Sequence, residues 1–242
     1  MLAKLGYPDF RLTAGAVCVY SQQVLWAVER LQGRVPIAAV STDFPHGQNS
    51  SLQVRCSQIR EAVARGATEI DVVIRRELAL CHRWRELYDE LVAMREACGQ
   101  AHLKVILGTG DLQDYRIIAM ASAVAIMAGA DFIKTSTGME AVNATFPIGL
   151  VMMRMIRRFF LEFDPGRMVG FKPAGGIRTA ADARKWLVLM LEELGRLDRR
   201  WIGSTLFRLG ASALYDDLAL QLTTNADGGG DKYADPDCMP LG

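Results

Sequence analysis

Seven short apolar runs, separated by seven longer segments of helical character, constrain the fold of this chain more than any other feature. The runs begin at Ala14, Val35, Thr68, His102, Asp131, Met168 and Ser204. Most of them are continuous rather than alternating, which is typical of parallel strands covered on both faces. The helix-like segments are 21–32, 50–65, 83–98, 112–128, 147–162, 179–195 and 211–222. Strand–helix units in this succession predict a parallel α/β protein.

Two architectures are built from such units. A doubly wound sheet that binds a nucleotide usually carries GxGxxG after its first strand, or a P-loop. The chain has neither, because the GTG at 108–110 is too short. The pattern therefore favours a TIM (β/α)8 barrel, whose functional residues lie at the C-terminal ends of the strands. The count does not fit this architecture fully, because seven strands are found rather than eight.

Local signals indicate where helices and the folded region end. Ser50 and Thr179 are predicted to cap helices, and Gly66 and Gly129 are predicted to follow the last turn of two others. Residues 1–222 are expected to form a single barrel domain. Residues 223–242 are rich in Gly, Asp and Pro, so we expect a flexible C-terminal tail.

Composition excludes several classes of partner. The net charge is +1 and there is no long Lys/Arg run, so neither nucleic acid nor a charged surface is an expected partner. No window approaches the roughly 18 apolar residues of a membrane span, and the N-terminus lacks the apolar core of a signal peptide. The three histidines lack HExxH spacing, so no metal site is expected.

The cysteines indicate a reducing compartment. Five are present, an odd number, and none forms a CxxC pair, which argues against a secreted disulfide framework. We therefore expect a cytoplasmic protein. Cys18, in AVCVY, is interpreted as a small core residue rather than a nucleophile, because no histidine is near it in sequence.

Two lysines follow apolar runs and precede turns rich in Gly, Ser and Thr. Lys134 lies in ADFIKTSTGM and Lys172 lies in VGFKPAGGIRT. Burial penalises a lysine's charge, and two lysines in one pocket repel each other, so one would lose its proton more easily. A neutral lysine can form a Schiff base with a carbonyl. Alternatively, each could extend to the rim or pair with an acid, and the pattern does not decide which lysine is the nucleophile.

A carboxylate inside an apolar strand completes the candidate catalytic group. Asp71, in TEIDVVI, needs a partner because an unpaired buried charge is costly. On a barrel strand it can point inward, meet a lysine and relay protons, although a purely structural salt bridge is the alternative. Lys104, in HLKVILGT, is interpreted mainly as a structural partner for an interior acid.

Glycines and hydroxyls near the later strands predict an anion site. Backbone N–H groups at helix starts bind anions, and barrels often hold phosphate after strands seven and eight. The candidate phosphate-binding residues are Thr137, Gly138, Gly175, Gly176, Arg178, Gly210 and Ser212. The alternative is that these glycines only form tight turns.

With these residues in place, the chain resembles the deoxyribose-phosphate aldolases, and its animal-type members in particular. The matching stretches, in the family's order, are AVCVY at Ala16, FPHG at Phe44, EIDVVI at Glu69, LKVIL at Leu103, ADFIKTSTG at Ala130, VNATFP at Val142, GFKPAGGIRT at Gly170 and LFRLGAS at Leu206. The resemblance covers roughly residues 14–215. Two of the motifs, ADFIKTSTG and GFKPAGGIRT, are long and specific.

The resemblance implies a (β/α)8 barrel that reversibly cleaves 2-deoxy-D-ribose 5-phosphate to glyceraldehyde 3-phosphate and acetaldehyde, in deoxyribose phosphate catabolism. It implies that Lys134 forms the Schiff base, that Lys172 is the neighbouring cation, and that Asp71 moves protons with Lys172. The residues implied to hold the phosphate are Gly138, Gly175, Gly176 and Ser212. Tyr233 is the candidate for a proton relay from the tail. No metal or organic cofactor is implied, and assembly into a homo-oligomer is left open.

Some positions depart from the family pattern. The first strand–helix unit, which carries an acid in a DLTTL-like segment, is not found before the run at Ala14. Met139 stands where a lysine is common, and Ala213 stands where a second hydroxyl is usual. These departures support an alternative, in which a truncated, inactive paralogue acts as a phosphate-ligand-binding or scaffold protein. A different Schiff-base aldolase of the barrel class is a third, weaker alternative.

Overall fold

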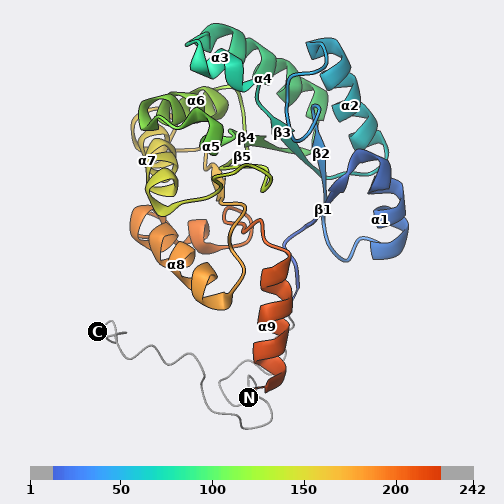
Figure 1. Cartoon of the computed structure of the whole chain (residues 1–242), viewed down its shortest axis with the longest axis vertical. Helices are drawn as coiled ribbons and strands as arrows, with labels where there is room; N and C mark the ends of the chain where they lie inside the picture. Colours follow the sequence, from blue (N-terminus) through green and yellow to red (C-terminus); the bar gives the residue numbers. More distant parts are fainter. Residues whose placement is uncertain (1–12, 225–242) are drawn as a thin grey trace.

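The computed structural model describes residues 13–224, which are organised around one curved, all-parallel sheet enclosed by helices (Figure 1). The six strands follow one another in chain order and are β1 Val17–Tyr20, β2 Ile37–Ser41, β3 Glu69–Val73, β4 His102–Ile106, β5 Phe132–Lys134 and β6 Gly170–Lys172. Each strand pairs in parallel with the next because a helical connection carries the chain back across the outside of the sheet. The predicted parallel α/β fold of TIM-barrel type is confirmed.

The helical connections match the predicted segments. The α-helices are α1 Val24–Leu31, α2 Leu52–Ala64, α3 Arg76–Leu80, α4 Trp84–Cys98, α5 Thr109–Leu112, α6 Tyr115–Met127, α7 Phe146–Glu162, α8 Ala180–Met190 and α9 Ala213–Thr224. Short turns of other helix types are η2 Ser21–Gln23, η3 Leu191–Gly195 and η4 Arg199–Ile202. The prediction missed α3, α5 and η4, which are one or two turns long and therefore too short to show a helical period.

Three of the four predicted helix ends are confirmed. The Thr179 side chain accepts a hydrogen bond from Asp182 N–H at the start of α8, and Gly66 and Gly129 follow α2 and α6 with φ of +102°. The prediction for Ser50 is wrong by one residue. Ser51 caps α2, because the hydroxyl of Ser50 donates instead to the Asp43 carboxylate at 2.8 Å.

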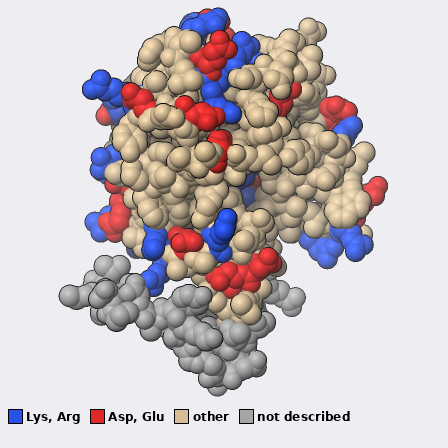
Figure 2. All heavy atoms as spheres, viewed as in Figure 1, with Lys and Arg blue, Asp and Glu red and all other residues tan. Residues whose placement is uncertain are grey.

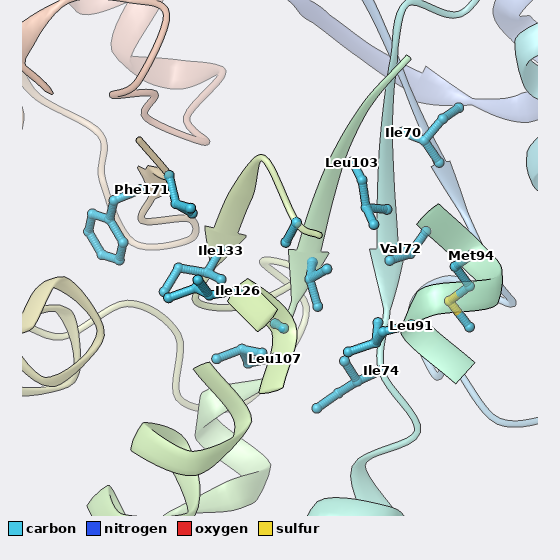
Figure 3. Packing of buried hydrophobic residues seen from close by; sticks show 14 of the residues in the cluster. Ile70, Val72, Ile74, Leu91, Met94, Leu103, Leu107, Ile126, Ile133 and Phe171 are labelled. Carbon is cyan, nitrogen blue, oxygen red and sulfur yellow. The ribbon is translucent and has the colours of Figure 1, made fainter. Parts of the chain in front are cut away.

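Alternate residues of the strands face two different environments. The outward side chains pack against the helices in one apolar core, in which Val72 of β3 lies beside Leu91 and Met94 of α4 (Figure 3). The inward side chains do not belong to this core. Cross-strand register places Asp71 opposite Lys104, and Lys134 opposite Lys172, on the inner side of the sheet. The geometry of paired parallel strands therefore brings these four charged side chains to the inside of the barrel.

The predicted seventh strand, from Ser204, is wrong as a strand. The segment forms two isolated parallel bridges, Phe207 with Phe171 of β6 and Gly210 with Ala174, which follows β6. A turn in which Leu206 and Phe207 N–H both donate to Gly203 C=O prevents an extended start. The segment nevertheless occupies the place that follows β6 around the sheet.

The flank of the sheet beside β1 is open among the described residues. The sheet order leaves β1 with one neighbour, β2, and its residues alternate between half-buried and exposed, whereas every residue of β2 is buried. Cys18 is therefore exposed, and its interpretation as a core residue is wrong, because none of the strands within residues 13–224 covers its free side.

Within residues 13–224, no helix is long and apolar enough to cross a membrane. Acidic and basic side chains are interspersed on the face shown in Figure 2 rather than gathered by sign. The tail predicted for 223–242, with Tyr233, lies outside the described residues except for Thr223 and Thr224, the last two residues of α9.

Candidate active site

The carboxylate of Asp71 accepts hydrogen bonds from three lysines inside the barrel. One oxygen of Asp71, Oδ2, accepts hydrogen bonds from Lys134 Nζ at 3.0 Å and from Lys172 Nζ at 2.7 Å. The other oxygen, Oδ1, accepts from Lys104 Nζ at 2.9 Å. Asp71 is fully buried, and Lys134 and Lys172 are only 4% and 7% exposed. Three of the residues that the sequence singled out, from three different strands, thus meet at one atom.

The two site lysines differ in how readily they lose a proton. Burial lowers the pKa of Lys134, the nearby charge of Lys172 lowers it further, and the attraction of Asp71 only partly offsets the two effects. Burial also disfavours the charged form of Lys172, but Asp71 outweighs it and raises the pKa of Lys172 above its ordinary value. The environment therefore favours Lys134 as the neutral amine and Lys172 as the ammonium, a choice that the sequence pattern left open.

Asp71 is held in its ionised form. Burial alone would raise the pKa of this carboxyl, but Lys104, Lys172 and Lys134 together lower it well below its ordinary value. A carboxylate that contacts lysines through both of its oxygens can accept and return a proton without becoming the group that holds it at rest.

A second charged layer lies beneath the first, toward the N-terminal ends of the strands. Lys104 Nζ reaches Glu69 Oε2 at 2.5 Å as well as Asp71, and Glu69 Oε1 lies 3.1 Å from Arg208 Nη2. Lys104 and Arg208 also lie over the ring of Phe132. Lys104 is therefore the partner of interior acids that the sequence suggested. It contacts two of them, and one is the acid at the centre of the site.

Glu69 and Arg208 were missed by the sequence analysis. A signal was present for Glu69, because it lies two residues before Asp71 on the same strand and so shares its inward face. Arg208 had no such signal, since the segment that carries it is not a regular strand and its direction depends on the bridges to β6.

The predicted phosphate-binding segments lie next to one another at the C-terminal ends of β5 and β6. Ser136 Oγ donates to Ala174 C=O at 2.5 Å, and Ala174 bridges in turn to Gly210. Gly138, Gly175 and Gly176 all have positive φ, which lets their N–H groups turn away from the strands. Beyond them, Arg178 and Ser212 are exposed at the starts of α8 and α9.

The described residues contain no group of three or more His, Cys, Asp or Glu side chains that could hold a metal ion. The charged layers inside the barrel consist of lysines, an arginine and two carboxylates that already pair with one another. The chemistry that this arrangement offers is that of an amine beside a proton carrier.

Comparison with known proteins shows the family of the chain. The family described as DeoC/LacD family aldolase matches residues 8–204. The chain belongs to this family. Within it, the chain is 50% identical over 244 residues to the deoxyribose-phosphate aldolase of Mus musculus and 49% identical to that of Homo sapiens. Both alignments cover 100% of this chain and 74% of the relative.

Solved structures described as putative deoxyribose-phosphate aldolases share the fold. A putative deoxyribose-phosphate aldolase from Coccidioides immitis is 28% identical, with a TM-score of 0.69 over 85% of this chain and 73% of that chain. One from Toxoplasma gondii has a TM-score of 0.77 over 89% of this chain and 82% of that chain, and at 23% identity it supports the fold alone.

Proposed function

We propose that this DeoC/LacD family aldolase reversibly cleaves 2-deoxy-D-ribose 5-phosphate to D-glyceraldehyde 3-phosphate and acetaldehyde, in the catabolism of deoxyribose phosphate. The observation that carries the proposal is the convergence of Lys134 and Lys172 on one oxygen of Asp71. The curated relatives at about half identity bear the name of this activity.

The reaction begins at Lys134. Its neutral amine attacks the aldehyde carbon of the open-chain sugar, and loss of water gives an iminium that withdraws electrons from the bond between C2 and C3. That bond breaks as the C3 hydroxyl gives up its proton, and glyceraldehyde 3-phosphate leaves. The enamine left on Lys134 takes a proton at C2, and water then hydrolyses the iminium to release acetaldehyde.

Lys172 and Asp71 move the protons of these steps. Lys172, whose pKa is raised mainly by Asp71 against the opposing effect of burial, is a protonated donor close to the amine of Lys134. Asp71 contacts both lysines through Oδ2, so a proton that leaves one can pass toward the other. We propose that Tyr233 serves a further relay from the tail.

The phosphate is proposed to bind at the glycine-rich segments after β5 and β6. Their N–H groups, on the segments that follow Lys134 and Lys172 in the chain, are suited to contact an anion. The proposed contact residues are Thr137, Gly138, Gly175, Gly176, Arg178, Gly210 and Ser212. The single-domain organisation of residues 1–222, a homo-oligomer and a cytoplasmic location remain predictions, the last supported by four free cysteines among the described residues.

The proposal is tested by trapping the intermediate. Borohydride added with acetaldehyde or deoxyribose 5-phosphate should reduce the iminium and leave a stable adduct on Lys134, found by peptide mass spectrometry. An adduct elsewhere, or none, would contradict the assignment.

The alternative of an inactive phosphate-binding or scaffold protein makes a different prediction. It requires that deoxyribose 5-phosphate raise the thermal midpoint without being cleaved. Chromatography of the same incubation decides between the two, because acetaldehyde appears only in the active case. Hexose phosphates assayed beside it test the third alternative.

A further inference from the structure

An acidic side chain already occupies part of the proposed phosphate site. The carboxylate of Glu140 accepts from Thr137 N–H at 3.0 Å and from Gly138 N–H at 3.2 Å. The Thr137 hydroxyl donates to Glu140 Oε2 at 2.7 Å. Two backbone amides and one hydroxyl that face a common point are the donors that an anion requires, and here they hold an anion of the chain itself.

Helix capping does not explain these contacts. The other carboxylate that binds amides in this region, Asp182, belongs to the capping box at the start of α8. Glu140 lies instead in the loop between β5 and α7, and that helix begins only at Phe146. The segment 135–145 contains no Lys or Arg, so its own sequence offers the carboxylate no counter-charge.

The position of Glu140 is held from both sides of the phosphate site. Asn143 Nδ2 donates to the backbone C=O of Glu140 at 2.9 Å. The Asn143 side chain lies so close to Gly175 that a Cβ there would come within 2.5 Å of its Cγ. Glu140 is thus anchored against the segment after β6, while its carboxylate reaches the segment after β5.

The space around Gly138 and Gly176 is open. At Gly138 and Gly176, nothing lies within 4 Å of where a Cβ would stand, and both have positive φ. A phosphate can therefore approach the amides of these segments, but at Thr137 and Gly138 it meets the half-buried carboxylate of Glu140. Met139, 63% exposed, adds no positive charge that would favour the phosphate over the carboxylate.

We propose that Glu140 is a resident anion that the substrate's phosphate must displace from Thr137 and Gly138, and that it lowers the preference of this chain for phosphorylated substrates. The inference rests on the proposed function for the location of the phosphate. A carboxylate and a phosphate accept the same hydrogen bonds and repel each other, so both cannot occupy these donors together. Glu140 is therefore a specificity-determining residue.

Binding of inorganic phosphate tests the inference directly. Glu140→Gln keeps one acceptor for Thr137 N–H and removes the charge, so the loop retains its shape. By calorimetry, we expect this variant to bind phosphate about tenfold more tightly than the wild type, the change that roughly 1.4 kcal/mol of relieved repulsion produces. Unchanged or weaker binding would overturn the inference. Glu29→Gln, on the exposed face of α1, is the matched control for the same change in net charge.

A second variant separates contact from charge. Glu140→Asp keeps the negative charge on a side chain that is one methylene shorter and does not reach the amides. Displacement predicts that this variant also binds inorganic phosphate more tightly than the wild type. If Glu140→Asp behaves as the wild type while Glu140→Gln binds more tightly, the carboxylate acts only through its field, and displacement is wrong.

Kinetics give an independent readout. The ratio of kcat/KM for deoxyribose 5-phosphate to kcat/KM for 2-deoxyribose should rise about tenfold in Glu140→Gln, for the same reason. A change of equal size for both substrates would indicate a structural role and overturn the inference. If the wild type cleaves neither sugar but Glu140→Gln and Glu140→Asp bind phosphate more tightly, the inference stands and the proposed reaction fails. If the wild type cleaves deoxyribose 5-phosphate but neither substitution of Glu140 changes the affinity for phosphate, the proposed reaction stands and the inference fails.

Discussion

The outer and inner faces of the barrel strands bury different kinds of side chain, apolar on the outer face and charged on the inner face. On the outer face, Val72, Leu103 and Ile133 are fully buried among apolar side chains of the helices. On the inner face, alternate positions of strands β3 to β6 carry charges that are also buried. These charged residues are Glu69, Asp71, Lys104, Lys134 and Lys172. Neighbouring residues of one strand therefore lie on opposite faces, one in the hydrophobic core and the next among the buried ion pairs.

The outer face therefore contributes mainly to the stability of the fold, and the inner face to its proposed chemistry. Burying apolar surface stabilises the fold directly, whereas buried ion pairs roughly compensate their own desolvation and add little net stability. The inner face is thus an inefficient way to hold the barrel together. Its value lies in the different protonation of Lys134 and Lys172, which an apolar interior could not provide.

The largest effect is expected at Lys134. Lys134→Arg keeps a positive charge but removes the nucleophile, since a guanidinium stays protonated at neutral pH. The rate of deoxyribose 5-phosphate cleavage should fall by about a thousandfold or more, because the covalent route is lost. Circular dichroism should show a folded protein. Lys185→Arg, the same change at an exposed position of α8, serves as the control, and retained activity in Lys134→Arg would place the nucleophile elsewhere.

Lys172→Met is expected to have the next largest effect, because it removes a proton donor. The cleavage rate should fall by about 10²–10⁴-fold, the usual range for a lost general acid or base. Removal of the neighbouring cation also lets the pKa of Lys134 rise.

The amine reacts when deprotonated, so a higher pKa for Lys134 moves the acid limb of kcat/KM to higher pH. A pH–rate profile measures the position of the limb independently of its height. A limb that stays in place or moves to lower pH would show that Lys172 does not act on Lys134 through its charge.

On the outer face, Ile133→Ala should affect stability instead. The side chain is fully buried in the apolar core, and its truncation should lower the free energy of unfolding by about 2–5 kcal/mol. Urea denaturation measures the loss, and kcat measured well below the melting transition should change little. A large loss of kcat with unchanged stability would contradict the separation of the two faces.

The smallest effect is expected in the deeper charged layer. Glu69→Gln removes a negative charge from the neighbourhood of Lys104 and Arg208, so the inner face becomes more positive. The groups that act on Lys134 most directly are Asp71, Lys172 and Cys18. With more positive charge nearby, the pKa of Lys134 should fall further and the acid limb of kcat/KM should move to lower pH.

The shift for Glu69→Gln is therefore opposite in direction to that for Lys172→Met. Arg208→Met, which removes a positive charge from the same layer, should move the limb back to higher pH. Shifts in one common direction for Glu69→Gln and Arg208→Met would indicate loosening of the barrel rather than electrostatics.

Strand content and spacing were predictable because they depend on local pattern. Continuous apolar runs identified all six strands, and helical periods located the helices that join them. The segment from Ser204 failed because its composition is that of a strand while its backbone turns at Gly203. Whether an apolar run becomes a strand depends on a partner strand, which local sequence does not describe.

The members of the site were partly predictable for the same reason. Asp71, Lys134 and Lys172 stand out because burying a charge inside an apolar run costs free energy unless the charge is paired. Glu140 could not be found in this way, since it lies in a polar loop where a glutamate is ordinary. Only the folded loop shows that its carboxylate accepts from Thr137 and Gly138.

By itself, the sequence determined that the chain forms parallel strands and which residues of each strand share a face, because a strand alternates its side chains with a period of two. The tertiary structure decided which faces meet, and hence that Lys134 and Lys172 share Asp71 Oδ2. It also decided which of the two lysines loses its proton. That choice depends on burial and on distances between charges from separate strands, and these exist only once the strands are in register.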